Sequence, residues 1–508
     1  MRPDGFSYGI RETGARPVKQ KWGMILSDKI LEERGYFWWH EEPIPKGHFA
    51  PSSLVTGTLS INEIGKIHLE LDGYLNGEHG PIATLIDRDR ELPGDKAIQG
   101  KLKDSNKNVL LLGLRKHGGR FSSNGVSFEG FAATNCLVTR GAFPLSNDPL
   151  QFDALDVELT GMEDWLRLGN IETKRTRSRI TARHRLPKSD MWQLDDGILT
   201  IRYDISGPFP SQYSRRSHEL TLIECASINF SPKNMLPLTE MRTEYGRMQD
   251  LFILLTGSEY SLAWPRLKAG KDTFDLYFHG HGRSSKAPTW DDCWTNFVQL
   301  RERFGEIFSL WRRKHNDFGP GFYLYLGTRR GMKLYVEHRF VNLIWGIESL
   351  HRKKNGRSSM PTKLEQKIQR ILLQIEGEDD REWLEGRLRN VSEPSLQQRL
   401  FEIFRHLPFD FDRKRLNRFC EECARCRNDI SHFGGQRHEG DYQNFVIDVA
   451  KKSEAIGYLY HALLLQEIGI DSALLRQWIF DGPKSFAVKY TLREVGLLPE
   501  EAKDHSSM

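Results

Sequence analysis

Cysteine is scarce in this 508-residue chain, which contains only six. Three are scattered along the chain, and the other three lie close together at Cys420, Cys423 and Cys426. Small secreted domains that depend on disulfides use many more cysteines for their length. The sparse distribution therefore argues against a disulfide framework.

Long apolar runs are also missing. The N-terminal stretch MRPDGFSYGIRETGARP has no apolar segment of the kind that signal peptides contain. The longest apolar run, near residues 455–465, is interrupted by Tyr458, Tyr460 and His461 and is too short to span a bilayer. We therefore expect a cytoplasmic protein with no membrane partner.

A strong excess of one charge is absent as well. The chain has 73 basic and 68 acidic residues. This balance does not by itself indicate a nucleic-acid-binding protein, but it allows a local basic face. Hydrophobic residues make up 38% of the chain, enough to build cores, and we find no repeat or low-complexity block. A chain of this length favours two or three domains.

The first 230 residues alternate apolar and polar side chains in short segments separated by turn residues. This pattern predicts antiparallel strands in a sandwich or partly open barrel. The expected strands are 53–61, 66–75, 108–115, 125–139, 151–159, 197–205 and 218–230.

After residue 232 the pattern becomes helical, with one expected strand at 273–283. The expected helices are 237–257, 295–315, 332–354, 361–376, 395–407, 412–432 and 441–468, with a basic loop at 351–363. Short connections favour an antiparallel bundle at the C-terminal end. We predict an α+β multidomain protein, in which a β-rich region with a few helices precedes an all-α bundle. The expected divisions are 1–235, a mixed connecting region 236–320, a bundle 321–475, and a tail 476–508 that holds a short strand or helix.

The segment RCRNDISHFGG, residues 425–435, places Arg427, Asn428 and His432 near the end of one predicted helix. On an ideal helix, five residues turn the chain by about 500°, so the arginine and the histidine point roughly 140° apart. Two glycines indicate that the helix ends or bends next to His432.

These residue types suit RNA cleavage without a metal. The 2′-hydroxyl of RNA is the nucleophile, an imidazole can exchange protons near pH 7, and a guanidinium can hold phosphoryl oxygens. Asn428 could add a hydrogen bond or orient the histidine. Because one arginine and one histidine are few for this reaction, we expect two copies to meet across a two-fold interface.

Plainer interpretations stay open on spacing alone. Arg427 could form a salt bridge at an ordinary helix end, and His432 could cap carbonyl groups. The cysteine cluster could hold Zn²⁺, although thiols at i, i+3 and i+6 of one helix fit a packing seam better. A basic loop could bind RNA or simply face solvent.

The context of RNDISH (427–432) resembles the R-x(4–6)-H signature of HEPN domains. LYVEHRFVNLIWGIESLHRKK (334–354), with Glu348, resembles the first HEPN helix of ApeA-like proteins. GHFAPSSLVTGTLSINEIGKIHLELDGYL (47–75) and the tryptophan of GMEDWL (161–166) resemble the ApeA N-terminal domain.

The resemblance implies an anti-phage protein that acts by abortive infection. Its HEPN bundle would dimerise and cut RNA, with tRNA as the expected substrate, leaving 2′,3′-cyclic phosphate ends and using no metal or other cofactor. Arg427, His432 and Asn428 would be catalytic, and a phage-derived trigger would act on the N-terminal region. We expect RNA to contact five basic side chains, Arg352, Lys353, Lys354, Arg418 and Arg425. The alternative is a non-catalytic HEPN interaction module joined to a β-domain that senses a ligand or protein.

Overall fold

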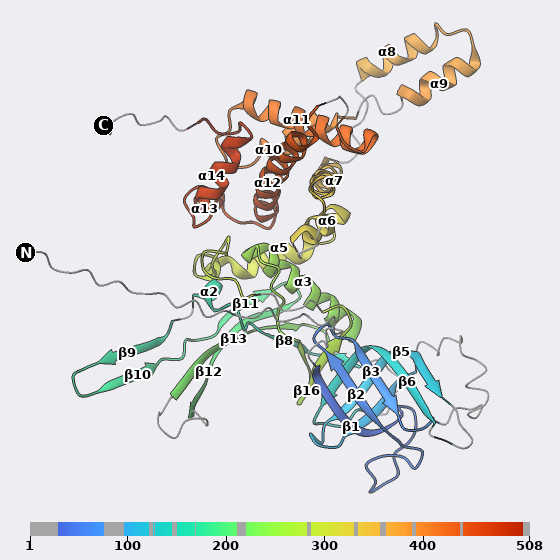
Figure 1. Ribbon diagram of the computed structural model, residues 1–508, viewed down its shortest axis with the longest axis vertical. Helices are drawn as coiled ribbons and strands as arrows, with labels where there is room; N and C mark the ends of the chain where they lie inside the picture. Colours follow the sequence, from blue (N-terminus) through green and yellow to red (C-terminus); the bar gives the residue numbers. More distant parts are fainter. Residues whose placement is uncertain are drawn as a thin grey trace, which may run out of the picture.

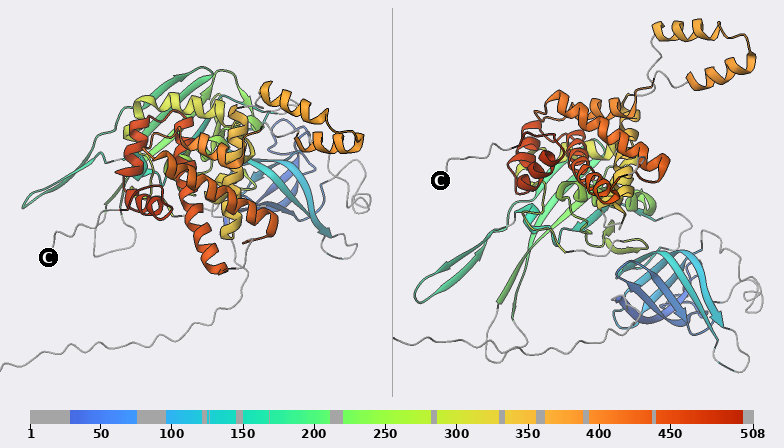
Figure 2. Two further views of the ribbon diagram at one scale, coloured as in Figure 1. Left: turned by 90° about the horizontal axis from the view of Figure 1, so that it is seen from above. Right: turned by 45° about the horizontal axis from the view of Figure 1, so that its top comes forward.

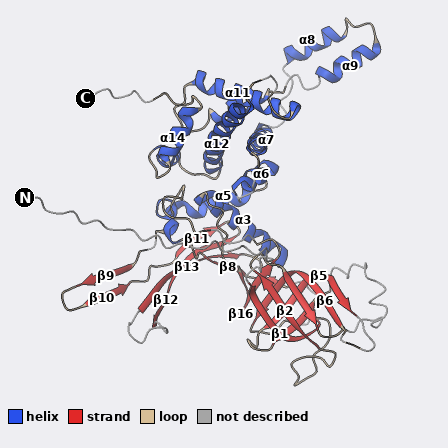
Figure 3. Ribbon diagram, viewed as in Figure 1, coloured by secondary structure: helices blue, strands red, loops and turns tan. Residues whose placement is uncertain are grey.

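The computed structural model describes residues 29–75, 96–120, 125, 127–144, 150–167, 169–210, 220–281, 286–329, 334–355, 362–388, 393–436 and 440–500. A strand-rich N-terminal region and a helical C-terminal region lie one above the other (Figures 1 and 3). The predicted fold class is confirmed.

Six strands of the N-terminal region close into a barrel in the order β6-β3-β2-β1-β4-β5, because β5 also pairs with β6. The barrel is therefore fully closed, where the sequence predicted a sandwich or a partly open barrel. Alternate side chains fill its interior, including Phe37, Leu69 and Phe131. The barrel strands are β1 (Lys29–Trp39), β2 (Val55–Asn62), β3 (Ile67–Leu71), β4 (Ile98–Leu102), β5 (Asn108–Arg120) and β6 (Phe128–Thr139).

The same sheet continues beyond β6 as an antiparallel extension in the order β16-β15-β8-β13-β12-β11. Two small antiparallel pairs, β7 with β14 and β9 with β10, lie beside it. These strands are β7 (Gln151–Phe152), β8 (Ala154–Glu158), β9 (Ile171–Arg175), β10 (Ile180–His184), β11 (Asp190–Leu194), β12 (Gly197–Pro210), β13 (Leu220–Pro232), β14 (Leu236–Pro237), β15 (Arg266–Ala269) and β16 (Asp272–Phe278).

Helices of the middle of the chain cover this extended sheet (Figure 1). Trp165 is fully buried among them and donates its indole N–H to Thr295 Oγ1 at 3.0 Å. The helices are α2 (Glu163–Leu166), α3 (Leu238–Thr256), α4 (Phe297–Leu300), the 3₁₀ turn η1 (Arg301–Arg303) and α5 (Phe304–Lys314).

The C-terminal region is a helical bundle around α12, which is buried along most of its length. A separate pair, α8 and α9, projects from the bundle (Figure 1). The helices are α6 (Gly319–Arg329), α7 (Val336–Asn355), α8 (Thr362–Leu372), α9 (Glu378–Leu388), α10 (Leu396–Phe404), α11 (Arg413–Phe433), α12 (Tyr442–Glu467), α13 (Ser472–Phe480) and α14 (Ser485–Glu494).

One continuous cluster of buried apolar side chains joins the extended sheet, α3, α5 and the bundle. At this junction the Trp294 ring lies 5.0 Å from the His461 ring of α12, and Lys314 pairs with Glu467 at 3.0 Å. Figure 2 shows the helices stacked over the extended sheet, with the barrel to one side. The two regions are therefore packed together over a common core.

The predicted helix 332–354 and the predicted basic loop 351–363 overlap at Arg352, Lys353 and Lys354. The structure places all three in α7, which extends to Asn355, so the start predicted for the loop was wrong. Cations in the last turn of a helix interact favourably with its dipole, and Arg352 also pairs with Glu348 one turn earlier. The tail predicted at 476–508 contains the end of α13 and the whole of α14. Residues 501–508 lie outside the described part of the chain.

Candidate active site at the end of helix α11

Helix α11 carries the Arg427–His432 motif and has clear sequence signals at both ends. The Asp412 side chain accepts hydrogen bonds from the backbone N–H groups of Lys414 and Arg415, each at 3.0 Å. Gly434 ends the helix with φ of 71°, a conformation that glycine adopts without strain. The helix therefore runs through Arg427 and His432 before it stops.

The Arg427 guanidinium points toward α7. Its Nη2 lies 3.4 Å from Glu348 Oε2, and its Nη1 donates to Asn428 Oδ1 at 3.0 Å. The side chain is 22% exposed, and its Nε has no hydrogen-bond partner within the described residues. These two contacts use two of the five N–H groups of the guanidinium, so it keeps donors for a further oxygen ligand.

Glu348 is itself held by a chain of charges. Arg352 lies 3.1 Å from Glu348 Oε1 and 3.0 Å from Glu393, and Glu393 pairs with Arg399 at 2.6 Å. Alternating charges of this kind fix each carboxylate in one position. The network thus determines where the Arg427 guanidinium lies, which the sequence did not reveal.

His432 lies in the last turn of α11 and is exposed. Its imidazole makes no hydrogen bond or ion pair with the residues that the structure describes. Because the helix is continuous between Arg427 and His432, the two side chains leave it in directions about 140° apart. One subunit therefore does not bring them together on one face.

An open pocket of about 460 Å³ adjoins this site, lined by Trp345, Glu348, Ser349, Arg352 and Lys353. Trp345 is 44% exposed, which is unusual for so large an aromatic side chain. Sequence reasoning missed it, although its place one turn before Glu348 on α7 was a usable signal. An exposed ring beside basic groups can stack on an RNA base.

Comparison with protein families now adds to this geometry. An ApeA N-terminal domain 1 model matches residues 32–311, and an Apea-like HEPN model matches residues 341–474. The chain belongs to the ApeA family. No curated protein and no solved structure matches it. HEPN domains generally act on RNA and dimerise, and an ApeA-like HEPN domain supports a role in anti-phage defence.

Most of the five basic residues predicted to bind RNA already form ion pairs or hydrogen bonds within this ApeA-family structure. Arg418 pairs with Glu422 at 3.0 Å, Arg352 pairs with two carboxylates, and Lys354 pairs with Glu467. The Lys353 ammonium donates to the Asn316 carbonyl at 3.0 Å. Arg425 is exposed and has no carboxylate partner among the described residues.

The cysteine cluster of α11 lies in the ApeA-family bundle core. Cys420 and Cys423 are fully buried, and Cys426 is 5% exposed. Burial raises the pKa of Cys420 to about 12 and that of Cys426 to about 11, which favours the neutral thiols. Within the described residues, no group of three or more His, Cys, Asp or Glu side chains is placed to hold a metal. The thiols act as a packing seam.

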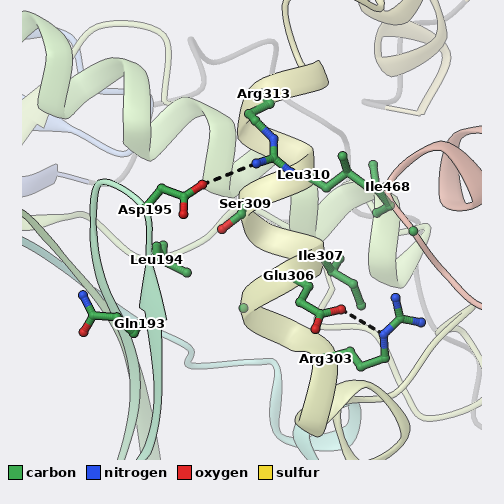
Figure 4. Close-up of a pocket in the computed structure, with 12 residues that line it drawn as sticks. Gln193, Leu194, Asp195, Arg303, Glu306, Ile307, Ser309, Leu310, Arg313 and Ile468 are labelled. Atoms are coloured by element: carbon green, nitrogen blue, oxygen red, sulfur yellow. Dashed lines mark hydrogen bonds and ion pairs between the residues drawn. The ribbon is translucent and has the colours of Figure 1, made fainter.

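Two further features lie away from the end of α11. His281, in the turn that follows β16, stacks on Trp264 with ring centroids 3.8 Å apart. A pocket of about 410 Å³ lies between the β11–β12 turn, α5 and the end of α12 (Figure 4). Its arginines are paired, Arg303 with Glu306 at 3.1 Å and Arg313 with Asp195 at 3.5 Å.

Among the helices that the structure describes, none has the length and apolar character that crossing a membrane requires.

Proposed function

We propose that this ApeA-family protein is a metal-independent endoribonuclease of anti-phage defence, in which Arg427 and His432 cut RNA. The observation that supports this best is that one helix carries both groups. The Arg427 guanidinium is held in place and half-buried beside an open pocket, and the His432 imidazole is exposed at the end of the same helix. Phosphoryl oxygens are the natural ligands of such a guanidinium.

The reaction needs no external nucleophile. The 2′-oxygen attacks the adjacent phosphorus and its proton passes to a neutral imidazole. The bond from phosphorus to the 5′-oxygen breaks, and an imidazolium protonates that leaving oxygen. The products are a 2′,3′-cyclic phosphate and a 5′-hydroxyl. Arg427 stabilises the charge on the non-bridging oxygens, and Asn428 orients Arg427 through the 3.0 Å hydrogen bond.

Two subunits are needed for a complete site. The reaction uses one base and one acid, and one subunit supplies a single His432 that points away from Arg427. A two-fold axis near the ends of two α11 helices would bring both copies of each residue to one phosphate. We therefore propose a homodimer formed through the HEPN bundle.

The proposed substrate is tRNA, whose loss would stop translation and abort infection. A nuclease of this kind must be restrained in uninfected cells. The N-terminal region packs directly on the bundle and is the part that we propose receives a phage-derived trigger. The proposed location is the cytoplasm.

Purified full-length protein incubated with bulk tRNA in EDTA tests the chemistry. We expect cleavage with cyclic phosphate ends, and a loss of at least about 100-fold in rate for Arg427→Ala and His432→Ala. Matched controls are Arg405→Ala and His48→Ala, since both residues are exposed and unpaired among the described side chains. Cleavage that EDTA abolishes, or that survives both site substitutions, would contradict the proposal.

A second function is favoured by one observation, the ion pair between Arg427 and Glu348. A neutralised arginine fits a non-catalytic HEPN module that serves as an interaction surface, with the β-domain as a sensor. That function predicts that Arg427→Ala and His432→Ala leave RNA integrity and protection against phage unchanged.

A further inference from the structure

The β9–β10 hairpin is a narrow antiparallel ribbon that projects from the N-terminal region (Figure 1). Arg175 pairs with Ile180 next to the turn, and Ile171 pairs with His184 at the base. The turn is closed by Thr176, whose backbone N–H donates to the Arg179 carbonyl at 2.7 Å. The hairpin is therefore an ordered arm with a defined tip.

The arm and the segment that follows it are strongly basic. Residues 171–188 contain seven arginines and lysines and one acidic residue, Glu172. All seven basic side chains are exposed, and none forms an ion pair with the described residues. They are Lys174, Arg175, Arg177, Arg179, Arg183, Arg185 and Lys188. This is unlike the predicted RNA-binding residues of the bundle, most of which are already paired.

The charges surround the arm instead of lying on one face. Arg175 belongs to one face of the ribbon and Lys174 and Arg183 to the other, because neighbouring side chains of a strand alternate. The base is anchored, since His184 Nε2 lies 3.1 Å from Glu224 Oε1 of β13. A hairpin that is anchored at one end and carries basic side chains on both faces can insert between two phosphate backbones.

We propose that the β9–β10 hairpin is a nucleic-acid-binding arm that grips the phosphate backbone of RNA. That the nucleic acid is RNA rests on the proposed function of the bundle. Five of the seven cations are arginines, whose planar fork matches a phosphate group. So many like charges on a thin ribbon repel one another unless a regular polyanion neutralises them.

An anionic membrane is a poorer partner for this surface. Membrane-binding surfaces combine cations with large apolar or aromatic side chains that enter the headgroup region. The large apolar residues exposed on the arm and its continuation are only Ile180 and Leu186, and residues 171–188 contain no Phe, Tyr or Trp. The arm belongs to the N-terminal region, and α11, the helix that contains Arg427, belongs to the bundle (Figure 1). Capture and cleavage of RNA are therefore assigned to different parts of the chain.

Binding of fluorescein-labelled bulk tRNA to the full-length protein tests the proposal. All proteins carry His432→Ala, so that cleavage does not alter the probe. The arm variant replaces four arginines by glutamine: Arg175, Arg177, Arg179 and Arg183. The control variant removes the same charge from exposed residues of the barrel by glutamine substitution: Lys103, Arg115, Arg120 and Arg140.

We expect the arm variant to raise the Kd more than tenfold near 150 mM salt. The slope of log K against log salt should fall by about 3, since each lost phosphate contact removes about 0.7 to 0.9. The control variant should stay within about threefold of the parent. Equal losses in both variants, an unchanged arm variant, or arm-dependent binding to phosphatidylglycerol vesicles but not to tRNA would each overturn the proposal.

The arm and the nuclease can fail separately. Arm-dependent tRNA binding by a protein that never cleaves RNA would support the arm and refute the proposed function. Cleavage that depends on Arg427 and His432, with tRNA affinity independent of the arm, would refute the arm alone. Thermal unfolding of each variant, expected within about 2 °C of the parent for exposed substitutions, separates both outcomes from misfolding.

Discussion

At the scale of single residues, the central contact is the one between Arg427 and Glu348. The arginine was visible in the sequence because it belongs to a compact motif with His432. Its partner lies 79 residues earlier on α7. Nothing local in the sequence links the two, because their proximity depends on how α7 packs against α11.

This contact predicts a graded mutational response. Glu348→Ala should lower the cleavage rate about tenfold, because Arg427 loses the group that positions it. Glu348→Gln should stay within about threefold of wild type, since its amide oxygen can still accept from the guanidinium. Single-turnover rates measure both variants. A faster Glu348→Ala enzyme would show instead that Glu348 competes with phosphate.

At the scale of elements, α11 is the part of the site that its sequence specified best. The sequence predicted a helix at 412–432 that ends next to two glycines, and α11 confirms both ends. Barrel closure was not predicted, because it depends on pairing between strands such as β5 and β6 whose registry only the folded sheet decides. The β9–β10 hairpin was not predicted, although its run of arginines is visible in the sequence, because apolar and polar residues alternate only weakly there.

The buried seam of α11 makes a prediction about stability. Cys423→Ala should lower the free energy of unfolding by about 1 kcal/mol, because it removes one buried sulfur. Cys225→Ala, at a partly exposed position, should have a smaller effect. EDTA should leave urea unfolding of the wild type unchanged. A large destabilisation by EDTA would point to a metal at the cysteines.

At the scale of the whole molecule, the two regions share one core, so the N-terminal region is more than an appended sensor. Deleting it would expose α12, and a loss of activity could then reflect misfolding. Substitutions at the junction in the full chain are the better probe of communication. His461 is suited to this, since it is fully buried against Trp294.

His461 should make stability depend on pH. Burial, with Arg329 and Lys484 nearby, lowers the pKa of His461 well below 6.5. Below pH 6.5 the unfolded chain binds a proton that the folded chain does not, so stability is lost as the pH falls and is fully present above that value. The slope from this group approaches about 1.4 kcal/mol per pH unit. Urea unfolding from pH 7.5 to 5 should show a shallower slope for His461→Gln than for wild type or the exposed control His48→Gln. Identical slopes in all three proteins would contradict this assignment.

The claim on which the account depends is that two subunits build one site. Co-expressing differently tagged chains yields a heterodimer in which only one subunit carries His432→Ala. If both imidazoles serve a single phosphate, as base and acid, the purified heterodimer should retain less than about a tenth of wild-type cleavage of tRNA. A heterodimer with half of the wild-type rate would show that each subunit cuts independently and would contradict the shared site.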